Sequence, residues 1–189
     1  PRTGLNPVTP AQTGSTITVN SGGDLQAALN AANPGDTINI QAGAVFTGTF
    51  YVPNKATDAN NWILVKTTGT LPAPNTRVSP ANASSMPRLQ KNGIGSDGSI
   101  LVIENGAKYW KFQGIEVSAQ FTSNAQGASQ TSLVCLGAGH DCSTSVTNSV
   151  DLPYDIIFDR CYIHGNNTGN SRRGITGNAQ RLIVIDSYI

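Results

Sequence analysis

An eight-residue pattern of apolar positions occurs three times in the second half of the chain. It reads WKFQGIEV from Trp110, IIFDRCYI from Ile156 and LIVIDSYI from Leu182. The second and third copies start 26 residues apart, and the first and second start 46 apart, close to two such periods. Within each copy the apolar residues alternate, slip by one position and alternate again, as in two short strands joined by a bend. A period in the twenties predicts a solenoid, and we interpret the copies as one face of a parallel β-helix.

The rest of the chain contains one helix pattern among strand patterns. A narrow apolar face over about residues 23–32 predicts a short helix, which would cover the open first rung of the solenoid. Residues 71–98 are rich in proline, so we expect most of this segment to be a long excursion from the coil. Strands are expected at 16–19, 37–40, 45–52, 62–66, 100–103, 109–117, 132–136, 154–164, 174–176 and 181–189. Together they predict an all-β fold of about five or six coils.

The two ends of the chain differ in pattern. Residues 1–15 are rich in Pro, Thr and Gly and predict an extended lead-in or linker, and residues 16–189 form the β-helix domain. Ile189 closes a copy of the repeat with no capping pattern after it. We therefore expect an open C-terminal end, either because the solenoid continues in a longer protein or because another copy covers the last rung.

Composition excludes two classes of partner. Only 12% of residues are charged and the formal net charge is +1. The chain therefore lacks the positive electrostatic potential that attracts nucleic acid or an anionic membrane. No apolar run approaches the roughly 20 residues of a membrane span.

The three cysteines indicate whether the protein works in an oxidising or a reducing compartment. Cys135 and Cys142 flank a short glycine-containing loop, which favours a local disulfide and an oxidising environment outside the cell. A free pair of thiols and a zinc site that includes His140 are the alternatives. Cys161 occupies an apolar column of the repeat and is predicted to be a buried free thiol.

Registering the repeat copies predicts which polar side chains share the outer face. Tyr162 should lie beside Tyr188, and Arg160 beside Asp186 as an ion pair, each one rung of ~4.8 Å apart. Such ladders also occur on solenoids without a binding function. The candidates for substrate contacts on this outer face are Tyr162, Tyr188, Lys111 and Glu116.

The first part of the chain resembles a known way in which β-helix proteins begin. The motif consists of Leu25, Ala28, Leu29, Ala32, Pro34-Gly35-Asp36-Thr37-Ile38, Ile40, Gly43, Phe46 and Gly48. It is similar to the N-terminal cap and first turn of right-handed parallel β-helix proteins of the pectate-lyase-like superfamily, above all polysaccharide lyases of the chondroitinase B and alginate lyase type. The match covers about residues 16–66. The resemblance implies a secreted protein that binds or cleaves extracellular polysaccharide, as a lyase or a glycoside hydrolase.

Cleavage of a polyuronate by a lyase needs a cation, a base and an acid. The local gathering of such side chains is Arg172, Arg173 and His164, for which a solvated basic loop is the ordinary alternative. Asp159 and Asp186 are candidate metal ligands, with calcium as the ion to consider. The catalytic residues of the chondroitinase-like lyases lie on later coils than this chain reaches, so none is carried over.

A second function, from a different class, fits the same fold. Low charge, the absence of an assembled acid and base set, and the uncapped last rung also favour a structural or adhesive β-solenoid. Such a module would stack end to end into a filament without catalytic activity.

Overall fold

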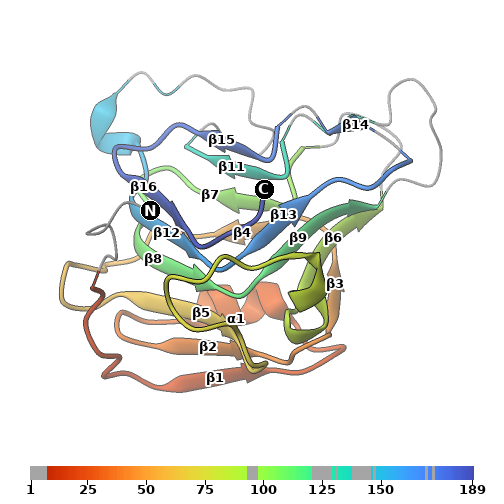
Figure 1. Ribbon diagram of the computed structural model, residues 1–189. Coiled ribbons are helices and arrows are strands. Elements are labelled where there is room, and N and C mark those ends of the chain that lie inside the picture. Colours follow the sequence, from red (N-terminus) through yellow and green to blue (C-terminus); the bar gives the residue numbers. More distant parts are fainter. Residues whose placement is uncertain are drawn as a thin grey trace.

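The strands of the protein wind into a parallel β-solenoid in the computed structural model (Figure 1). The structure describes residues 8–92, 98–120, 129–130, 132–137, 146, 148–168, 170–171 and 173–189. All strand pairs within the three main sheets are parallel and in register. The predicted all-β parallel fold is confirmed.

Three sheets, which we call A, B and C, form the walls of the solenoid. Sheet A has the strand order β1 (Thr16–Val19), β2 (Thr37–Ile40), β5 (Ile63–Thr67), β8 (Lys108–Gln113), β12 (Tyr154–Asp159) and β16 (Leu182–Ile185). Sheet B has the order β13 (Tyr162–His164), β9 (Glu116–Gln120), β6 (Arg88–Asn92) and β3 (Val45–Thr47). Sheet C has the order β15 (Ile175–Gly177), β11 (Val134–Leu136), β7 (Leu101–Ile103) and β4 (Phe50–Val52). A separate pair joins β10 (Ser129–Gln130) to β14 (Asn170–Ser171).

The solenoid has about four to five coils, where the repeat pattern predicts five or six. Four coils contribute a strand to each of the three sheets, and β16 begins another. The difference arises because β1 belongs to the cap with helix α1 (Leu25–Ala31) and not to a full coil. The side chain of Asp24 caps this helix by accepting from Ala27 N at 2.8 Å, which satisfies a free N–H of its first turn. Leu25, Ala28 and Leu29 are buried, and the helix contacts β1 and β4, as the apolar face predicts.

The core is built from columns of apolar side chains that repeat from coil to coil. Phe112 and Phe158 pair in register and their rings stack at 5.2 Å. Trp110, Ile115 and Val117 are fully buried, as the inward positions of the repeat predict. The slip in the pattern corresponds to a two-residue bend between sheets A and B, at residues 114–115 and 160–161. Equivalent residues there have positive φ, namely Gly114 (67°), Arg160 (51°) and Asp186 (51°).

The prediction for residues 71–98 needs a correction. After a short 3₁₀ helix, η1 (Pro80–Ser85), the chain returns to the coil as β6, which pairs with β3 and β9. The sequence of β6 is RLQKN, in which Leu89 is the one apolar residue. The alternation of apolar and polar residues is therefore too weak to predict the strand. The part of the excursion before η1 crosses the bends between sheets A and B, since Val78 N donates to Asp186 O at 2.8 Å. A second 3₁₀ helix, η2 (Ser149–Asp151), precedes β12.

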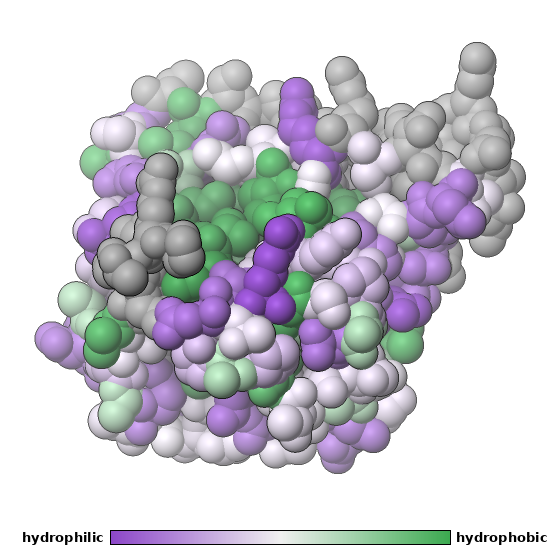
Figure 2. Space-filling model, in the orientation of Figure 1, coloured by the Kyte–Doolittle hydropathy of each residue, from purple (hydrophilic) through white to green (hydrophobic). Residues whose placement is uncertain are grey.

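The last coil presents apolar side chains at the surface. Figure 2 shows a patch of hydrophobic residues near the centre of the view, with hydrophilic residues beside and below it. Val184 is 40% exposed and Ile189 is 53% exposed. Within the described part of the chain, no helix has the length and apolar character needed to cross a membrane.

Candidate functional site

The outer face of sheet B brings together polar and aromatic residues from four consecutive coils. Arg88, Glu116 and Tyr162 are partners in the parallel register, and Tyr188 continues this column through a bridge to Tyr162. His164 lies in the next outward column, beside Ser118. In-register parallel strands place such residues one rung of ~4.8 Å apart, however distant they are in sequence. We call Arg77, Arg88, Glu116, Tyr162, His164 and Tyr188 the sheet B cluster.

A buried carboxylate lies at the centre of the sheet B cluster. The side chain of Glu116 is 1% exposed, and its Oε1 lies 2.9 Å from Arg88 Nε and 2.9 Å from His164 Nε2. Burial of an unpaired carboxylate would be strongly unfavourable, so the ion pair with Arg88 and the hydrogen bond with His164 are what make the position tolerable. Glu116 therefore holds Arg88 and His164 in place and does not face a ligand itself.

Both ring nitrogens of His164 face acceptors. Nδ1 lies 2.7 Å from the carbonyl oxygen of Gly165, and Nε2 contacts Glu116. A neutral imidazole carries one N–H and can satisfy one of these acceptors, whereas the imidazolium carries two and satisfies both. In this arrangement protein acceptors engage both ring nitrogens of His164, so neither nitrogen presents a free lone pair to act as a base.

Aromatic rings form a continuous row beside this carboxylate. The rings of Tyr162 and His164 stack with centroids 3.9 Å apart, and Tyr188 meets Tyr162 edge to face at 5.5 Å. The Arg77 guanidinium lies 4.9 Å from the centroid of the Tyr188 ring, and its Nε donates to Ser187 O at 2.9 Å. Burial, with the Glu116 charge as a further cause, raises the pKa of the Tyr162 phenol above its ordinary value of 10. The phenol thus stays neutral at pH 7.

Four of the predicted site residues meet in this cluster, namely Tyr162, Tyr188, Glu116 and His164. The predicted placement of Tyr162 one rung from Tyr188 is confirmed. Sequence reasoning missed Arg77 and Arg88. Both lie in or after the proline-rich excursion, where no apolar period indicates which coil a residue joins.

The predicted candidates Lys111 and Asp159 lie on sheet A. Asp159 accepts from Arg160 Nε at 2.8 Å and from Gln113 Nε2 at 2.7 Å, and Lys111 Nζ is 3.0 Å from its Oδ2. Burial raises the pKa of Asp159, but the bonds from Arg160 and Gln113 and the charge of Lys111 outweigh it, so the pKa is lowered overall. Asp159 is a carboxylate whose oxygens are already engaged by protein donors.

The predicted ion pair between Arg160 and Asp186 is wrong. Arg160 binds the neighbouring Asp159, and its third nitrogen donates to Pro72 O at 2.8 Å. Asp186 instead accepts from Asn75 N at 2.6 Å. The excursion supplies these main-chain partners, which the repeat pattern does not contain. Among the described residues, no group of three or more His, Cys, Asp or Glu side chains is placed to hold a metal ion.

The remaining predicted residues are distributed as follows. Arg172, His140 and Cys142 lie outside the described residues. Arg173 is exposed, and its main-chain carbonyl accepts from Leu133 N. Cys161 is a buried free thiol, as predicted, and burial raises its pKa to about 12. The disulfide between Cys135 and Cys142 stays a prediction.

Comparison with known proteins gives a fold likeness and no family. Neither a protein-family model nor a curated protein matches the chain. Among solved structures, the chain is similar to the crystal structure of an alginate lyase from Paenibacillus sp. str. FPU-7, with a TM-score of 0.47 and 17% sequence identity. The alignment covers 79% of this chain and 44% of that chain, so this chain spans less than half of that protein's length. At this level of similarity we draw no argument about chemistry from the match.

Proposed function

We propose that this chain acts outside the cell and binds an acidic polysaccharide across the outer face of sheet B. The observation that carries the proposal is the row of three contacting rings, His164, Tyr162 and Tyr188, flanked by two arginines. Aromatic rings offer apolar surface to the C–H faces of sugars, and guanidinium groups pair with carboxylates in a planar, two-bond geometry. The combination suits a polymer of acidic sugars.

The charge of the sheet B cluster supports an anionic ligand. Arg77 and Arg88 are opposed by the single carboxylate of Glu116, so the cluster is positive. Glu116 is buried and contacts both partners, so they compensate its charge and the carboxylate is not exposed to solvent. Arg77 is exposed and bonded through one nitrogen to a main-chain carbonyl, which leaves guanidinium donors for a ligand.

The geometry supports binding better than cleavage. The cluster supplies cations, but a lyase also needs a base to remove the α-proton. The Tyr162 phenol is neutral, and His164 has both nitrogens engaged, so none of the described side chains of the cluster is a free base. Cleavage is tested directly by following the absorbance of the unsaturated product on a panel of polyuronates, with and without calcium.

The binding proposal is tested by isothermal titration of a soluble polyuronate into the full chain, with a neutral glucan as comparator. We expect Tyr188→Ala and Arg77→Gln each to weaken polyuronate binding about tenfold, or about 1.4 kcal/mol. The control for Tyr188→Ala is Tyr154→Ala, since Arg181 lies 4.9 Å from the Tyr154 ring, the same distance as in the Arg77–Tyr188 pair.

The control for Arg77→Gln is Lys55→Gln, because Lys55 is a half-buried cation that likewise donates to one main-chain carbonyl, that of Asn30. Circular dichroism and melting temperature establish that each variant is folded. Equal affinity in Tyr188→Ala and Tyr154→Ala, or equal binding of the neutral glucan, would contradict the proposal.

End-to-end stacking as a structural module remains the alternative from another class. Electron microscopy of concentrated protein distinguishes the two, because stacking predicts filaments and the binding proposal predicts separate particles that associate with polysaccharide.

A further inference from the structure

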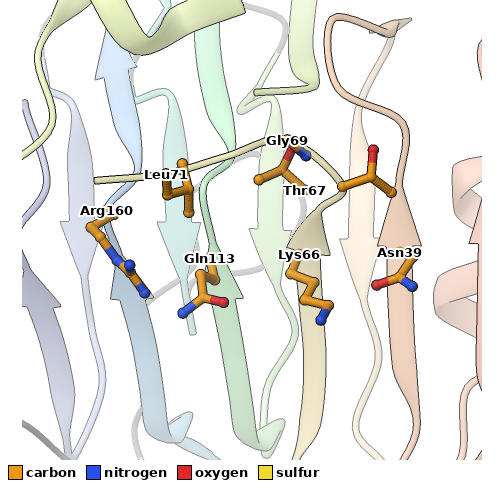
Figure 3. Close-up of a pocket in the computed structure, with 8 residues that line it drawn as sticks. Asn39, Lys66, Thr67, Gly69, Leu71, Gln113 and Arg160 are labelled. Carbon is orange, nitrogen blue, oxygen red and sulfur yellow. The ribbon is translucent and has the colours of Figure 1, made fainter. Parts of the chain in front are cut away.

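A groove with its own polar chemistry lies on the outer face of sheet A. Its volume is about 470 Å³. Asn39, Lys66, Gln113 and Arg160 line one side of it, and residues of the loop 67–71 line the other (Figure 3). None of these residues belongs to the sheet B cluster.

The floor of the groove is a row of polar side chains, one from each strand. Asn39 on β2 pairs with Lys66 on β5, and Lys66 pairs with Gln113 on β8. These three side chains are therefore successive rungs, ~4.8 Å apart along the solenoid axis. Figure 3 shows them side by side on adjacent strands, with Arg160 beyond Gln113.

The charge of the groove is positive. Lys66 and Arg160 are its two cations, and no acidic residue is among the described residues that line it. Arg160 is engaged with Asp159, whereas Lys66 has no ion-pair partner in the described part of the chain. An unpaired ammonium group in a concave polar surface attracts an anion.

The groove also contains an acceptor without a donor. Asn39 Oδ1 is buried and has no hydrogen-bond partner among the described residues. Buried polar atoms are rarely left unpaired, and the group that would satisfy this oxygen is an O–H or N–H donor. Because Asn39 is one rung from Lys66, a single ligand could place an anionic oxygen on Lys66 and a hydroxyl on Asn39.

The walls are held in position before any ligand arrives. Thr67 Oγ1 donates to Ser85 O at 2.6 Å, and Thr68 Oγ1 accepts from Ala42 N at 3.0 Å. A Cβ on Gly69 would lie 2.2 Å from Ser85 O, so the loop approaches η1 as closely as glycine allows. On the other side, Gln113 is fixed by its bond to Asp159. A preformed site loses little free energy to reorganisation on binding.

We infer that this groove binds a small hydroxy acid, with its carboxylate on Lys66 and a hydroxyl group donating to Asn39 Oδ1. Leu71 supplies an apolar contact for the carbon skeleton, and Gln113 and Arg160 supply further polar contacts. The inference is independent of polysaccharide binding on sheet B, because the two sites share no residue.

Three probes of similar size test this chemistry by isothermal titration or NMR on the full chain. Gluconate carries both a carboxylate and hydroxyls, sorbitol carries hydroxyls alone, and hexanoate carries a carboxylate alone. We expect gluconate to bind at least tenfold more tightly than either of the other two. Binding of sorbitol or hexanoate as tight as that of gluconate, or no binding of gluconate, would overturn the inference.

Variants assign the binding to the groove. Lys66→Gln should weaken gluconate binding at least tenfold, and Lys66→Arg should retain most of it. Asn39→Ala should reduce the preference for gluconate over hexanoate. Lys55→Gln, which removes a half-buried cation elsewhere, should leave gluconate affinity unchanged. Unchanged affinity in a folded Lys66→Gln variant refutes the assignment, whatever the result for polyuronate.

Discussion

Sheets A and B each bury a carboxylate on the outer side of the solenoid, but they neutralise it differently. Asp159 on sheet A binds the next residue, Arg160, together with two side chains of the neighbouring strand β8. Glu116 on sheet B has no such local partner, and it is shared between Arg88 of one neighbouring coil and His164 of the other.

The network of Asp159 is therefore local, whereas the network of Glu116 depends on the stacking of successive coils. The partners of Asp159 come from its own bend and one adjacent strand, so the network stabilises the corner of the coil. Among the described residues it leaves the nearby Lys66 without an ion-pair partner. The partners of Glu116 come from strands on both sides, so His164 and Arg88 take up their positions when three coils are assembled. The following predictions test this contrast, starting with the largest expected effect.

Arg160→Ala should destabilise the protein by about 3 to 5 kcal/mol, because it leaves the buried Asp159 without its main cation and frees the Pro72 carbonyl. Both Arg and Ala carry a Cβ, so the positive φ at this bend adds no new cost. Urea unfolding measures the loss. The double variant with Asp159→Asn should recover part of it, and a loss below about 1 kcal/mol would contradict the sheet A interpretation.

Glu116→Gln should cost about 1.5 to 3 kcal/mol, because charge-assisted contacts to Arg88 and His164 are lost while the volume is kept. The same variant should weaken polyuronate binding, since Arg88 and His164 lose the group that positions them. Gluconate binding in the sheet A groove should not change. A variant of wild-type stability that binds polyuronate normally would show that Glu116 does not organise the cluster.

The stability contribution of Asp159 should disappear in acid. Its folded-state pKa lies below the ordinary value of 3.8, so the contribution is complete above about pH 4 and is lost as the pH falls through the folded pKa. Unfolding free energies at pH 7 and pH 3 should differ less in Asp159→Asn than in the wild type. An identical difference in both proteins would mean that Asp159 is not stabilised in its ionised form.

Alkylation of the native protein at pH 8 without reductant should label none of the three cysteines. Cys161 lies beneath the bend between the two faces, is fully buried and has a pKa of about 12, so it remains a protected thiol. Cys135 and Cys142 are expected to be joined as a disulfide. Mass spectrometry counts the labels, and modification of both Cys135 and Cys142 would exclude that disulfide.

Much of the fold and part of the site could be predicted from the repeat. The inward positions Trp110 and Phe112 and the pairing of Tyr162 with Tyr188 followed from aligning the copies. The strand β6 could not be found in this way, because Leu89 alone carries its apolar pattern. Without β6, Arg88 had no assigned neighbour, and its contact with Glu116 was not predictable.

The sequence by itself determined the coil, the register of its later rungs and the buried thiol of Cys161. Side chains alternate across a strand and in-register parallel strands stack like on like, so a repeated apolar pattern specifies both which face is buried and which residues are neighbours. Only the tertiary structure decided which contacts the excursion makes. They include the Arg77 guanidinium over the Tyr188 ring and the hydrogen bond from Arg160 to the Pro72 carbonyl. The path of that segment depends on contacts between residues about a hundred positions apart, and no local period encodes such contacts.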